Sequence, residues 1–506
     1  MKTGVRFATN KGNNYLYNSR HNRFQFCHPV LKHLLDLHRG GIDVKGWVKN
    51  LKGADSNIGG EIFSEEEIEY YYRKYSALLK IGFLDETEND DRPFAEVQPA
   101  DIHKMLANTG QITFEVTDAC NLKCDYCGYG KFYCNYDKRE NRNLSFAFAV
   151  SILNYMSDLW NSNLNKSHGK NIFISFYGGE PLLNFPFIEQ VVRYIRKLKI
   201  LHNRVTFSIT TNGILLDKYI EFFVTYDFNV MVSLDGNAEN NSYRVFKNGE
   251  PGYEKLLEIL KMVRAKYPDY FRRKITFNAV LHNKNSVAEI HEYFKKSFGK
   301  VPTIGELNTS GIKDSQKEEF LRTYSNINES LYKSENYSAI EREMFINLPG
   351  IQSTGIFLNK YSNCAYWDYN QLLSRHGEAK GLVTGTCYPF SKKIFVTVNG
   401  KILPCERIGH QYALGNVDEK GVQLNFENIA AKYNAYYDKM RKQCIACYNR
   451  KACVQCMYHL NIDSEAPKCH GFMNLKNFSK YLSNQISYLE KNPDFYSRIM
   501  REVVLA

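Results

Sequence analysis

The spacing of apolar and polar residues changes along the chain, and the change divides it into regions. In the first hundred residues, two short strand-like runs at 14–17 and 24–26 flank a polar turn. Helical patterns follow, the first opened by Pro29 and the second capped by Ser64. We therefore expect a small separate unit over residues 1–95.

From residue 111 the pattern becomes one of short apolar strands separated by segments long enough for a helix each. Five such strands begin at residues 112, 171, 204, 229 and 275. Repeated strand–helix units predict an α/β fold with a parallel sheet, open or curled into a barrel, with its chemistry at the C-terminal ends of the strands. We assign residues 105–302 to this unit. Residues 303–380 are polar and Tyr-rich, and we treat them as an insertion or bridge.

Composition narrows the class of protein. The chain has 506 residues, of which 43% are hydrophobic and 24% charged, as in an ordinary globular protein. No stretch approaches the ~20 apolar residues of a membrane span, and the N-terminus lacks a signal-peptide pattern, so we expect a cytoplasmic protein with no membrane partner. In that compartment the 13 cysteines are expected to bind metal rather than form disulfides. The net charge of +12 is thinly spread, so we expect no nucleic-acid partner.

Candidate chemistry begins in the loop after the first strand of the sheet. Cys120, Cys124 and Cys127 follow the spacing C-x3-C-x2-C. Three thiolates on one loop can hold three irons of a 4Fe-4S cube and leave the fourth iron open to a substrate. A zinc loop with Cys134 as the fourth ligand is the alternative. The spacing favours the cluster, because structural zinc sites commonly pair two C-x2-C units.

A second cysteine array lies in the last region, residues 381–506, which an amphipathic helix closes. Around Gly400 the array begins as C-x12-G-x4-C, continues as C-x2-C-x5-C-x2-C and ends on a single cysteine. Its seven members are Cys387, Cys405, Cys444, Cys447, Cys453, Cys456 and Cys469. Taken alone, the group at 444–456 would most often be a zinc site.

With Tyr126 before its last cysteine, the first loop resembles the signature of the radical S-adenosylmethionine (radical SAM) enzymes. The stretches FYGGEP at 176–181, ITTNG at 209–213 and SLDG at 233–236 match further motifs in the family's order. Taken singly, GGEP is more simply a turn, Ser233 a hydroxyl at a strand end and Arg244 a surface cation. The resemblance implies a partial (β/α)6 TIM-like barrel that binds S-adenosylmethionine. By this resemblance the cofactor-binding residues would be Tyr126, Gly178, Gly179, Glu180, Ser233 and Arg244.

The C-terminal array resembles the SPASM domain, an extension that carries two auxiliary 4Fe-4S clusters in peptide-modifying relatives. By position, Cys387, Cys405 and Cys456 would serve the first auxiliary cluster and the other four cysteines the second. The first set is one ligand short. Either Cys364 completes it, or the iron stays open to bind a substrate thiolate and Cys364 is an inert buried thiol. Two residues separate Cys453 from Cys456 where the family usually has three, which leaves the ligation by this pair open.

Two further resemblances concern the substrate. Glu406 follows Cys405 at a place where sulfatase-maturing relatives carry an acidic residue thought to act as a base, and a surface Glu406 paired with Arg407 is the alternative. The N-terminal unit, which closes with ALLKIGFLDE at 77–86, resembles the PqqD-like domain that captures a leader peptide as an added strand. A generic winged-helix fold, which could bind DNA, is the alternative there.

Together these resemblances imply a radical SAM peptide maturase with three 4Fe-4S clusters, one binding S-adenosylmethionine and two auxiliary. Its partners would be a precursor peptide with a leader sequence and an electron donor such as flavodoxin or ferredoxin. Its product would be a thioether or carbon–carbon crosslink in the peptide, with Glu406 as the catalytic residue. The rivals are a sulfatase-type maturase that makes formylglycine, a radical enzyme that modifies tRNA or nucleotides, and a zinc-stabilised binding module without catalysis.

Overall fold

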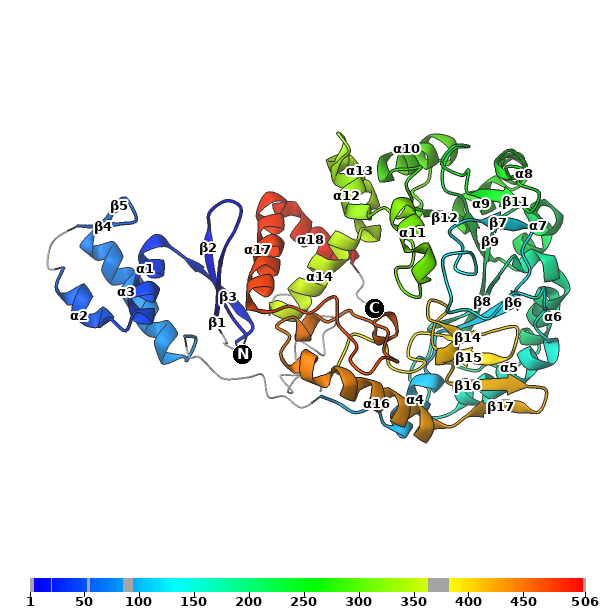
Figure 1. Cartoon of the computed structure of the whole chain (residues 1–506), viewed down its shortest axis with the longest axis horizontal. Helices are drawn as coiled ribbons and strands as arrows, with labels where there is room; N and C mark the ends of the chain where they lie inside the picture. Colours follow the sequence, from blue (N-terminus) through cyan, green and yellow to red (C-terminus); the bar gives the residue numbers. More distant parts are fainter. Residues whose placement is uncertain (1–3, 20, 52–54, 85–93, 363–381, 504–506) are drawn as a thin grey trace.

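The computed structural model describes residues 4–19, 21–51, 55–84, 94–362 and 382–503. The molecule is elongated, with the N-terminal unit at one end, the large sheet at the other, and helices α14, α17 and α18 between them (Figure 1). Among the described helices, none is both long and apolar enough to cross a bilayer.

The N-terminal unit is a three-stranded antiparallel sheet followed by helices and a small hairpin. Its elements are β1 (Gly4–Ala8), β2 (Asn14–Asn18), β3 (Arg23–Cys27), α1 (Pro29–Arg39), α2 (Val44–Lys49), β4 (Ser56–Ile58), β5 (Glu61–Phe63) and α3 (Glu65–Lys80). The predicted strands are β2 and β3, and the predicted helix starts at Pro29 and Ser64 are confirmed. Strand β1, which the sequence analysis did not predict, pairs with β2 and forms one edge of the sheet.

A ten-stranded sheet dominates the other end, in the order β13-β12-β10-β9-β8-β6-β14-β15-β16-β17. Its strands are β6 (Gln111–Thr117), β8 (Asn171–Gly178), β9 (Arg204–Thr211), β10 (Asn229–Ser233), β12 (Ile275–Val280), β13 (Thr303–Gly305), β14 (Ile394–Val396), β15 (Lys401–Leu403), β16 (Gly415–Asp418) and β17 (Gly421–Leu424). From β13 to β14 neighbouring strands run parallel, and beyond β14 they run antiparallel. The five predicted strands are β6, β8, β9, β10 and β12, so the α/β fold with a mainly parallel sheet is confirmed.

Five strands of this sheet, β13 to β17, lie outside the predicted barrel region of 105–302, and two of them, β13 and β14, pair in parallel with their neighbours on the barrel side. β13 extends the parallel part by three residues that we had assigned to the bridge. β14 comes from the cysteine-rich C-terminal region and pairs in parallel with β6. Three-residue strands are too short to show an alternating pattern, which explains why the sequence did not reveal them.

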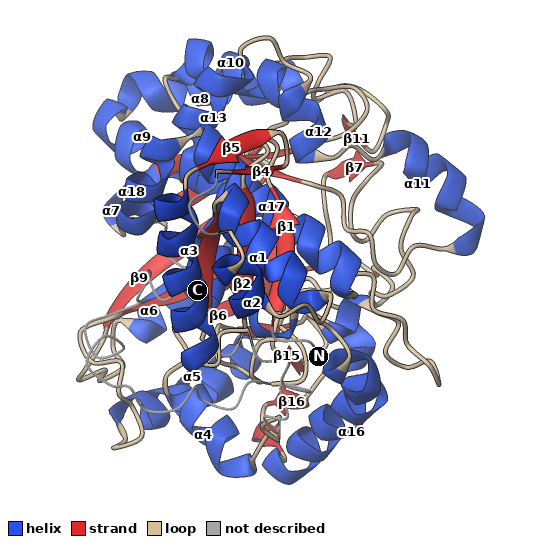
Figure 2. Ribbon diagram, turned by 90° about the vertical axis from the view of Figure 1, so that its left-hand side faces the viewer, coloured by secondary structure: helices blue, strands red, loops and turns tan. Residues whose placement is uncertain are grey.

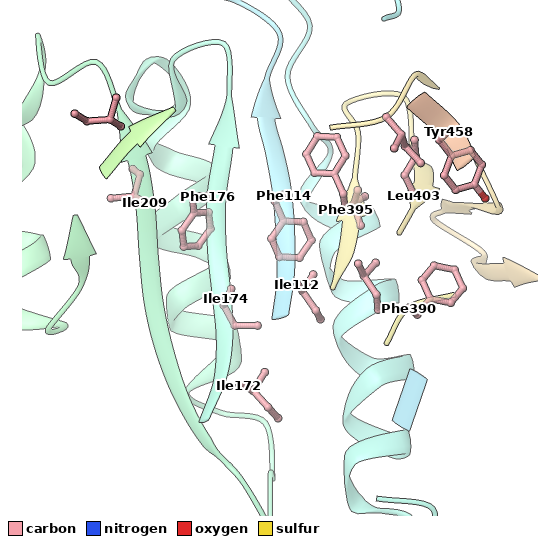
Figure 3. Close-up of a cluster of buried hydrophobic side chains, with 14 of the residues drawn as sticks. Ile112, Phe114, Ile172, Ile174, Phe176, Ile209, Phe390, Phe395, Leu403 and Tyr458 are labelled. Carbon is pink, nitrogen blue, oxygen red and sulfur yellow. The ribbon is translucent and has the colours of Figure 1, made fainter. Parts of the chain in front are cut away.

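Helices follow the parallel strands and cover the sheet (Figure 2). They are α4 (Pro99–Ala107), α5 (Phe146–Asn161), α6 (Phe185–Ile195), α7 (Leu216–Thr225), α8 (Tyr253–Lys266), α9 (Pro268–Lys274) and α10 (Val287–Phe298). The apolar cluster under the helices runs from Ile209 of β9 across Phe176 and Phe114 to Leu403 of β15 (Figure 3).

The opposite face of the sheet is polar. Ser175 accepts a hydrogen bond from the Gln111 side chain at 2.9 Å and shares one with Ser208 at 2.6 Å. On the same face Glu115 of β6 lies opposite Tyr177 of β8. Because residues two apart on a strand share a face, the alternation of Ile112, Phe114 and Val116 with Thr113, Glu115 and Thr117 produces this division.

The remaining helices join the two ends of the molecule. They are α11 (Lys317–Thr323), α12 (Ile327–Tyr332), α13 (Tyr337–Met344), α14 (Pro349–Tyr361), α16 (Phe426–Ile445), α17 (Leu475–Lys491) and α18 (Pro493–Glu502). The expected bridge at 303–380 thus begins with β13 and is mainly helical from residue 314 to 361.

The N-terminal sheet packs against these joining helices. The Tyr17 ring contacts the rings of Tyr361 on α14 and Phe478 on α17, with centroids 5.8 and 6.2 Å apart. The hydroxyls of Ser479 and Ser483 on α17 donate hydrogen bonds to backbone carbonyls of β1. One face of the N-terminal unit is therefore continuous with the main core, and the unit is less separate than predicted.

Candidate functional site

The first cysteine loop lies at the C-terminal end of β6, as the sequence predicts. Within it, β7 (Leu122–Cys124) pairs antiparallel with β11 (Arg244–Phe246), which sets Cys124 opposite Arg244. The backbone N–H of Leu122 points at the Cys120 sulfur at 3.4 Å, and the Arg139 guanidinium points at the Cys127 sulfur at 3.5 Å. Donors of this kind stabilise thiolate ligands and tune an iron–sulfur cluster.

Burial favours the protonated form of two of these thiols, Cys120 and Cys124, when no metal is present. It raises the pKa of Cys124 to about 12, although the Arg244 guanidinium lowers it and the charges of Cys127 and Cys120 raise it further. Burial also raises the pKa of Cys120. The mutual influence of the three groups shows that they lie near one another, and iron supplies the positive charge that turns such thiols into thiolates. The loop therefore fits a cluster.

The alternative ligand Cys134 lies further along the same loop. Its thiol is exposed and donates to the Gly311 carbonyl at 3.4 Å. Among the described residues, no three Cys, His, Asp or Glu side chains converge as the ligands of one metal ion do.

Gly178 and Gly179 allow the end of β8 to press against the start of the cysteine loop. Gly178 has a φ of 130°, which L side chains rarely adopt. A Cβ on Gly178 would overlap the Thr117 carbonyl, and one on Gly179 would overlap the Ala119 carbonyl. The N–H groups of Gly179 and Glu180 donate to those carbonyls, both at 2.8 Å. The glycine pair therefore fixes the position of the cysteine loop.

The Glu180 carboxylate is fully buried and ties β8 to the end of β9. It accepts hydrogen bonds from the Thr211 hydroxyl at 2.7 Å and from the backbone N–H groups of Asn212 at 2.7 Å and Leu182 at 3.1 Å. Burial raises the pKa of Glu180 to about 7, and these three donors oppose that rise. This geometry gives Glu180 a positioning role, and its predicted contact with a cofactor stays a prediction.

Two more predicted residues, Tyr126 and Arg244, meet at Asp235. The guanidinium of Arg244 donates to both oxygens of Asp235, at 3.0 and 3.1 Å, and the Tyr126 hydroxyl donates to one of them. Asp235 is fully buried and Arg244 is 8% exposed. Ser233, the last residue of β10 and two residues before Asp235, is half-buried. The sequence analysis overlooked Asp235, although the quoted motif SLDG contains it.

The C-terminal cysteines form two neighbouring sets. Cys444 is affected electrostatically by Cys453, Cys469 and Cys447, and burial raises its pKa to about 12. The other set is Cys387, Cys405 and Cys456, and all three influence the buried hydroxyl of Tyr433.

Backbone N–H groups point at sulfurs in both sets. They come from Gly385 to Cys453 at 3.3 Å, from Met473 to Cys447 at 3.4 Å and from Arg407 to Cys405 at 3.3 Å. Cys364 lies outside the described residues.

Glu406 directly follows Cys405 and lies near two tyrosines, Tyr136 and Tyr177, that are also near the first loop. Tyr136 and Tyr177 are each influenced by both Cys127 and Glu406. One carboxylate oxygen of Glu406 pairs with Lys393 at 3.1 Å, and the other is buried without a hydrogen-bond partner among the described residues. Its ion-pair partner is therefore Lys393, and the predicted alternative, a surface pair with Arg407, is not the one observed.

A buried carboxylate that the sequence analysis missed lies beside this region. Glu115 is 1% exposed; it accepts a hydrogen bond from the Tyr129 hydroxyl and another from the Val398 N–H at 2.9 Å. Burial raises its pKa. A charged residue inside the apolar run ITFEV is the signal that could have identified it, because an unneutralised carboxylate in such a strand needs buried partners.

Comparison with known proteins decides the family of this region. Residues 114–296 match the family model of the Radical SAM superfamily. The chain carries a radical SAM domain. The domain extends from β6 to α10, and it implies S-adenosylmethionine and a 4Fe-4S cluster as cofactors.

Two curated proteins that are similar to this chain have different names and activities. A cysteine-type anaerobic sulfatase-maturating enzyme of Clostridium novyi is 24% identical over 385 residues, 74% of this chain and 92% of the relative. The radical SAM cyclopropyl synthase TigE of Paramaledivibacter caminithermalis is 24% identical over 377 residues, 66% of this chain and 74% of the relative.

A solved structure shares the fold. Native anSMEcpe with bound AdoMet superposes with a TM-score of 0.53 at 18% identity, covering 77% of this chain and 99% of its own.

Proposed function

We propose that this protein is a radical SAM peptide maturase that installs a thioether or carbon–carbon crosslink in a ribosomally made precursor peptide. The observation that carries the proposal is that the two cysteine regions share one sheet: the Cys120 loop follows β6, and Cys405 follows β15, which pairs through β14 with β6. A peptide held there would meet a radical source on one side and a second redox group on the other.

Cys120, Cys124 and Cys127 would hold the radical-generating cluster. Such a cluster, when bound with S-adenosylmethionine, supplies the electron that produces a 5′-deoxyadenosyl radical. Glu180 and the glycine pair position the cysteine loop, and Asp235 holds Tyr126 and Arg244. In this proposal, S-adenosylmethionine would lie beside these residues.

The two C-terminal cysteine sets would hold auxiliary clusters that accept the electron left when the new bond forms. Flavodoxin or ferredoxin would serve as the external electron donor. Glu406 would take the proton released from the substrate, because its free oxygen has no partner among the described residues. Lys393, which pairs with the other oxygen, would hold the carboxylate in place.

The N-terminal unit would hold the leader of the precursor. Strand β1 is covered, since serine hydroxyls of α17 occupy two of its carbonyls. Strand β3 is the other edge of this sheet and carries Phe26, which is 45% exposed. An extended leader added to β3 would gain backbone hydrogen bonds and an apolar contact at Phe26.

Formylglycine formation is the second candidate function. It is favoured by the similarity to the Clostridium novyi sulfatase-maturating enzyme, 92% of whose length is matched. Both candidates need a peptide substrate, so the product distinguishes them. A crosslink removes two hydrogens and joins two residues, whereas formylglycine formation converts one Cys or Ser to an aldehyde.

The decisive experiment measures radical formation first and product second. Anaerobically reconstituted protein with dithionite and S-adenosylmethionine should release 5′-deoxyadenosine, and Cys124→Ala should not. Peptides encoded beside the gene and a sulfatase-derived Cys peptide are then compared by tandem mass spectrometry. A colourless, zinc-loaded protein that releases no 5′-deoxyadenosine would refute the enzymatic function.

Leader binding needs a point variant, because deleting residues 1–95 would remove Val5, Phe7 and Tyr17 from the main core. Phe26→Glu should weaken binding of a fluorescent precursor at least tenfold. Ile42→Glu, at another exposed apolar position of the same unit, should not. If Phe26→Glu binds the precursor as tightly as Ile42→Glu does, the β3 edge is not the leader site.

A further inference from the structure

Three buried tyrosines lie near the Cys387, Cys405 and Cys456 set. Tyr433 and Tyr437 lie on α16, and Tyr458 lies in the short 3-10 helix Met457–His459. Their exposed fractions are 0%, 1% and 4%. The Tyr433 ring is 6.1 Å from Tyr437 and 5.9 Å from Tyr458, edge to face in both pairs. The three rings therefore form one packed cluster.

All three hydroxyls lack a hydrogen-bond partner among the described residues. Tyr433 and Tyr458 approach each other, but not with the geometry of a hydrogen bond. A buried hydroxyl without a partner costs about 1–3 kcal/mol, and three in one cluster require an explanation. Phenylalanine would fill the same space without that cost.

The missing partner is indicated by the neighbouring thiols. Tyr433 is influenced by Cys456, Cys387 and Cys405, and Tyr437 by Cys456 and Cys387. Tyr458 is influenced by Cys456. Tyr458 also lies two residues after Cys456, at the start of the same 3-10 turn, and its ring packs against Tyr433. The three tyrosines are thus close to the one set of cysteines that is short of a ligand among the described residues.

We propose that the hydroxyls of Tyr433, Tyr437 and Tyr458 donate hydrogen bonds to the sulfurs of an iron–sulfur cluster held by Cys387, Cys405 and Cys456, and so set its reduction potential. This inference rests on the proposed function, which places an auxiliary cluster there. Reduction by one electron makes the sulfurs more negative, and O–H donors stabilise that added charge.

Hydrogen-bond donation by the three hydroxyls explains their arrangement better than direct binding of their oxygens to iron does. A cluster with three cysteine ligands has one open iron, so at most one of the three oxygens could bind it. A phenol has an ordinary pKa near ~10 and remains a donor at neutral pH. Thiolate and sulfide sulfurs offer several acceptor positions, enough for all three hydroxyls.

The test is a potentiometric titration with dithionite, followed by electron paramagnetic resonance. It uses full-length protein in which Cys120, Cys124 and Cys127 are replaced by Ala, so that the radical-generating cluster is absent. The signal that disappears on further substitution of Cys405 identifies the cluster concerned. Tyr433→Phe, Tyr437→Phe and Tyr458→Phe are compared with Tyr270→Phe, a buried tyrosine on α9 whose hydroxyl donates to the Phe228 carbonyl at 2.8 Å.

We expect each of the three variants to keep its iron and to shift the potential of this cluster to more negative values, while Tyr270→Phe leaves it unchanged. Unchanged potentials in all three variants would overturn the inference. Loss of iron in a single variant would also overturn it, because that tyrosine would then be a ligand. Iron content is compared first between the starting protein and the same protein with Cys405 substituted. If the two contain equal iron, the proposed auxiliary cluster is absent, and the inference fails together with it.

Discussion

The ion pair between Asp235 and Arg244 gives the sharpest prediction for the stability of the barrel. Asp235→Asn keeps the shape of the side chain but leaves the Arg244 charge without its bidentate partner. Breaking a buried pair from one side costs about 3–5 kcal/mol. Asn also has a single carbonyl oxygen to serve Arg244, Tyr126 and the Val280 N–H, all of which donate to Asp235.

The pKa of Asp235 shows the same preference for the charged pair, at a smaller magnitude. Burial raises this pKa, but the Arg244 charge, the hydrogen bonds from Arg244 and Tyr126 and the nearby ring of His282, 3.8 Å away, more than compensate and hold it at about 2. Relative to an ordinary value of 3.8, this depression corresponds to ~2 kcal/mol in favour of the charged form. Because the folded pKa is depressed, this stability is present above pH ~4 and is lost as pH falls towards 2. At pH 7 the full effect should be measured.

The assay is urea unfolding of the apoprotein at pH 7, followed by circular dichroism. We expect Asp235→Asn to lose about 3–5 kcal/mol and Arg244→Met a comparable amount, because each leaves one buried charge unpaired. The double variant should lose much less than the sum of the two, since both charges are then gone. Additive losses, or a loss below ~1 kcal/mol in Asp235→Asn, would refute the reasoning.

Three further predictions concern the cofactor and substrate regions. Gly179→Ala should lose most of its first cluster on reconstitution, measured as iron per protein, because the added Cβ displaces the Ala119 carbonyl beside Cys120. Glu180→Gln should remove a pH dependence of the free energy of unfolding. With a folded pKa of about 7 for Glu180, the wild type loses ~3 kcal/mol of that free energy as pH rises from 4.5 to 8. The same pH dependence in both proteins, measured by urea unfolding, would contradict this. Glu406→Gln should lower the yield of modified peptide by about 10²–10⁴ while 5′-deoxyadenosine still forms, and a normal peptide yield would exclude Glu406 as the base.

The sequence predicted most of the parallel sheet and the family motifs, because both depend on local patterns. Strands of five or more residues, such as β6 and β9, alternate clearly enough to be recognised. The match of residues 114–296 to the Radical SAM superfamily agrees with the resemblance drawn from the Cys120–Cys127 loop.

What the sequence did not reveal depends on contacts between distant segments. Asp235 meets Arg244 and Tyr126 only after β10 and the cysteine loop have packed together. Glu115 is satisfied by Val398, which is 283 residues away along the chain. The pairing of Glu406 with Lys393 rather than its neighbour Arg407 is likewise a result of the hairpin geometry. No local pattern encodes such partners.

The pairing of β14 with β6 has a consequence for how this molecule can vary. Cys405 follows β15, β15 pairs with β14, and β14 pairs with β6, whose end carries the Cys120 loop. The strands that precede Cys405 and the Cys120 loop are therefore joined by a continuous ladder of backbone hydrogen bonds. If the proposed function is correct, the spacing of these two regions is fixed, and side chains such as Tyr177 would set the range of accepted residues. For the same reason, the C-terminal region cannot be exchanged as an independent module without also replacing the sheet edge that receives it.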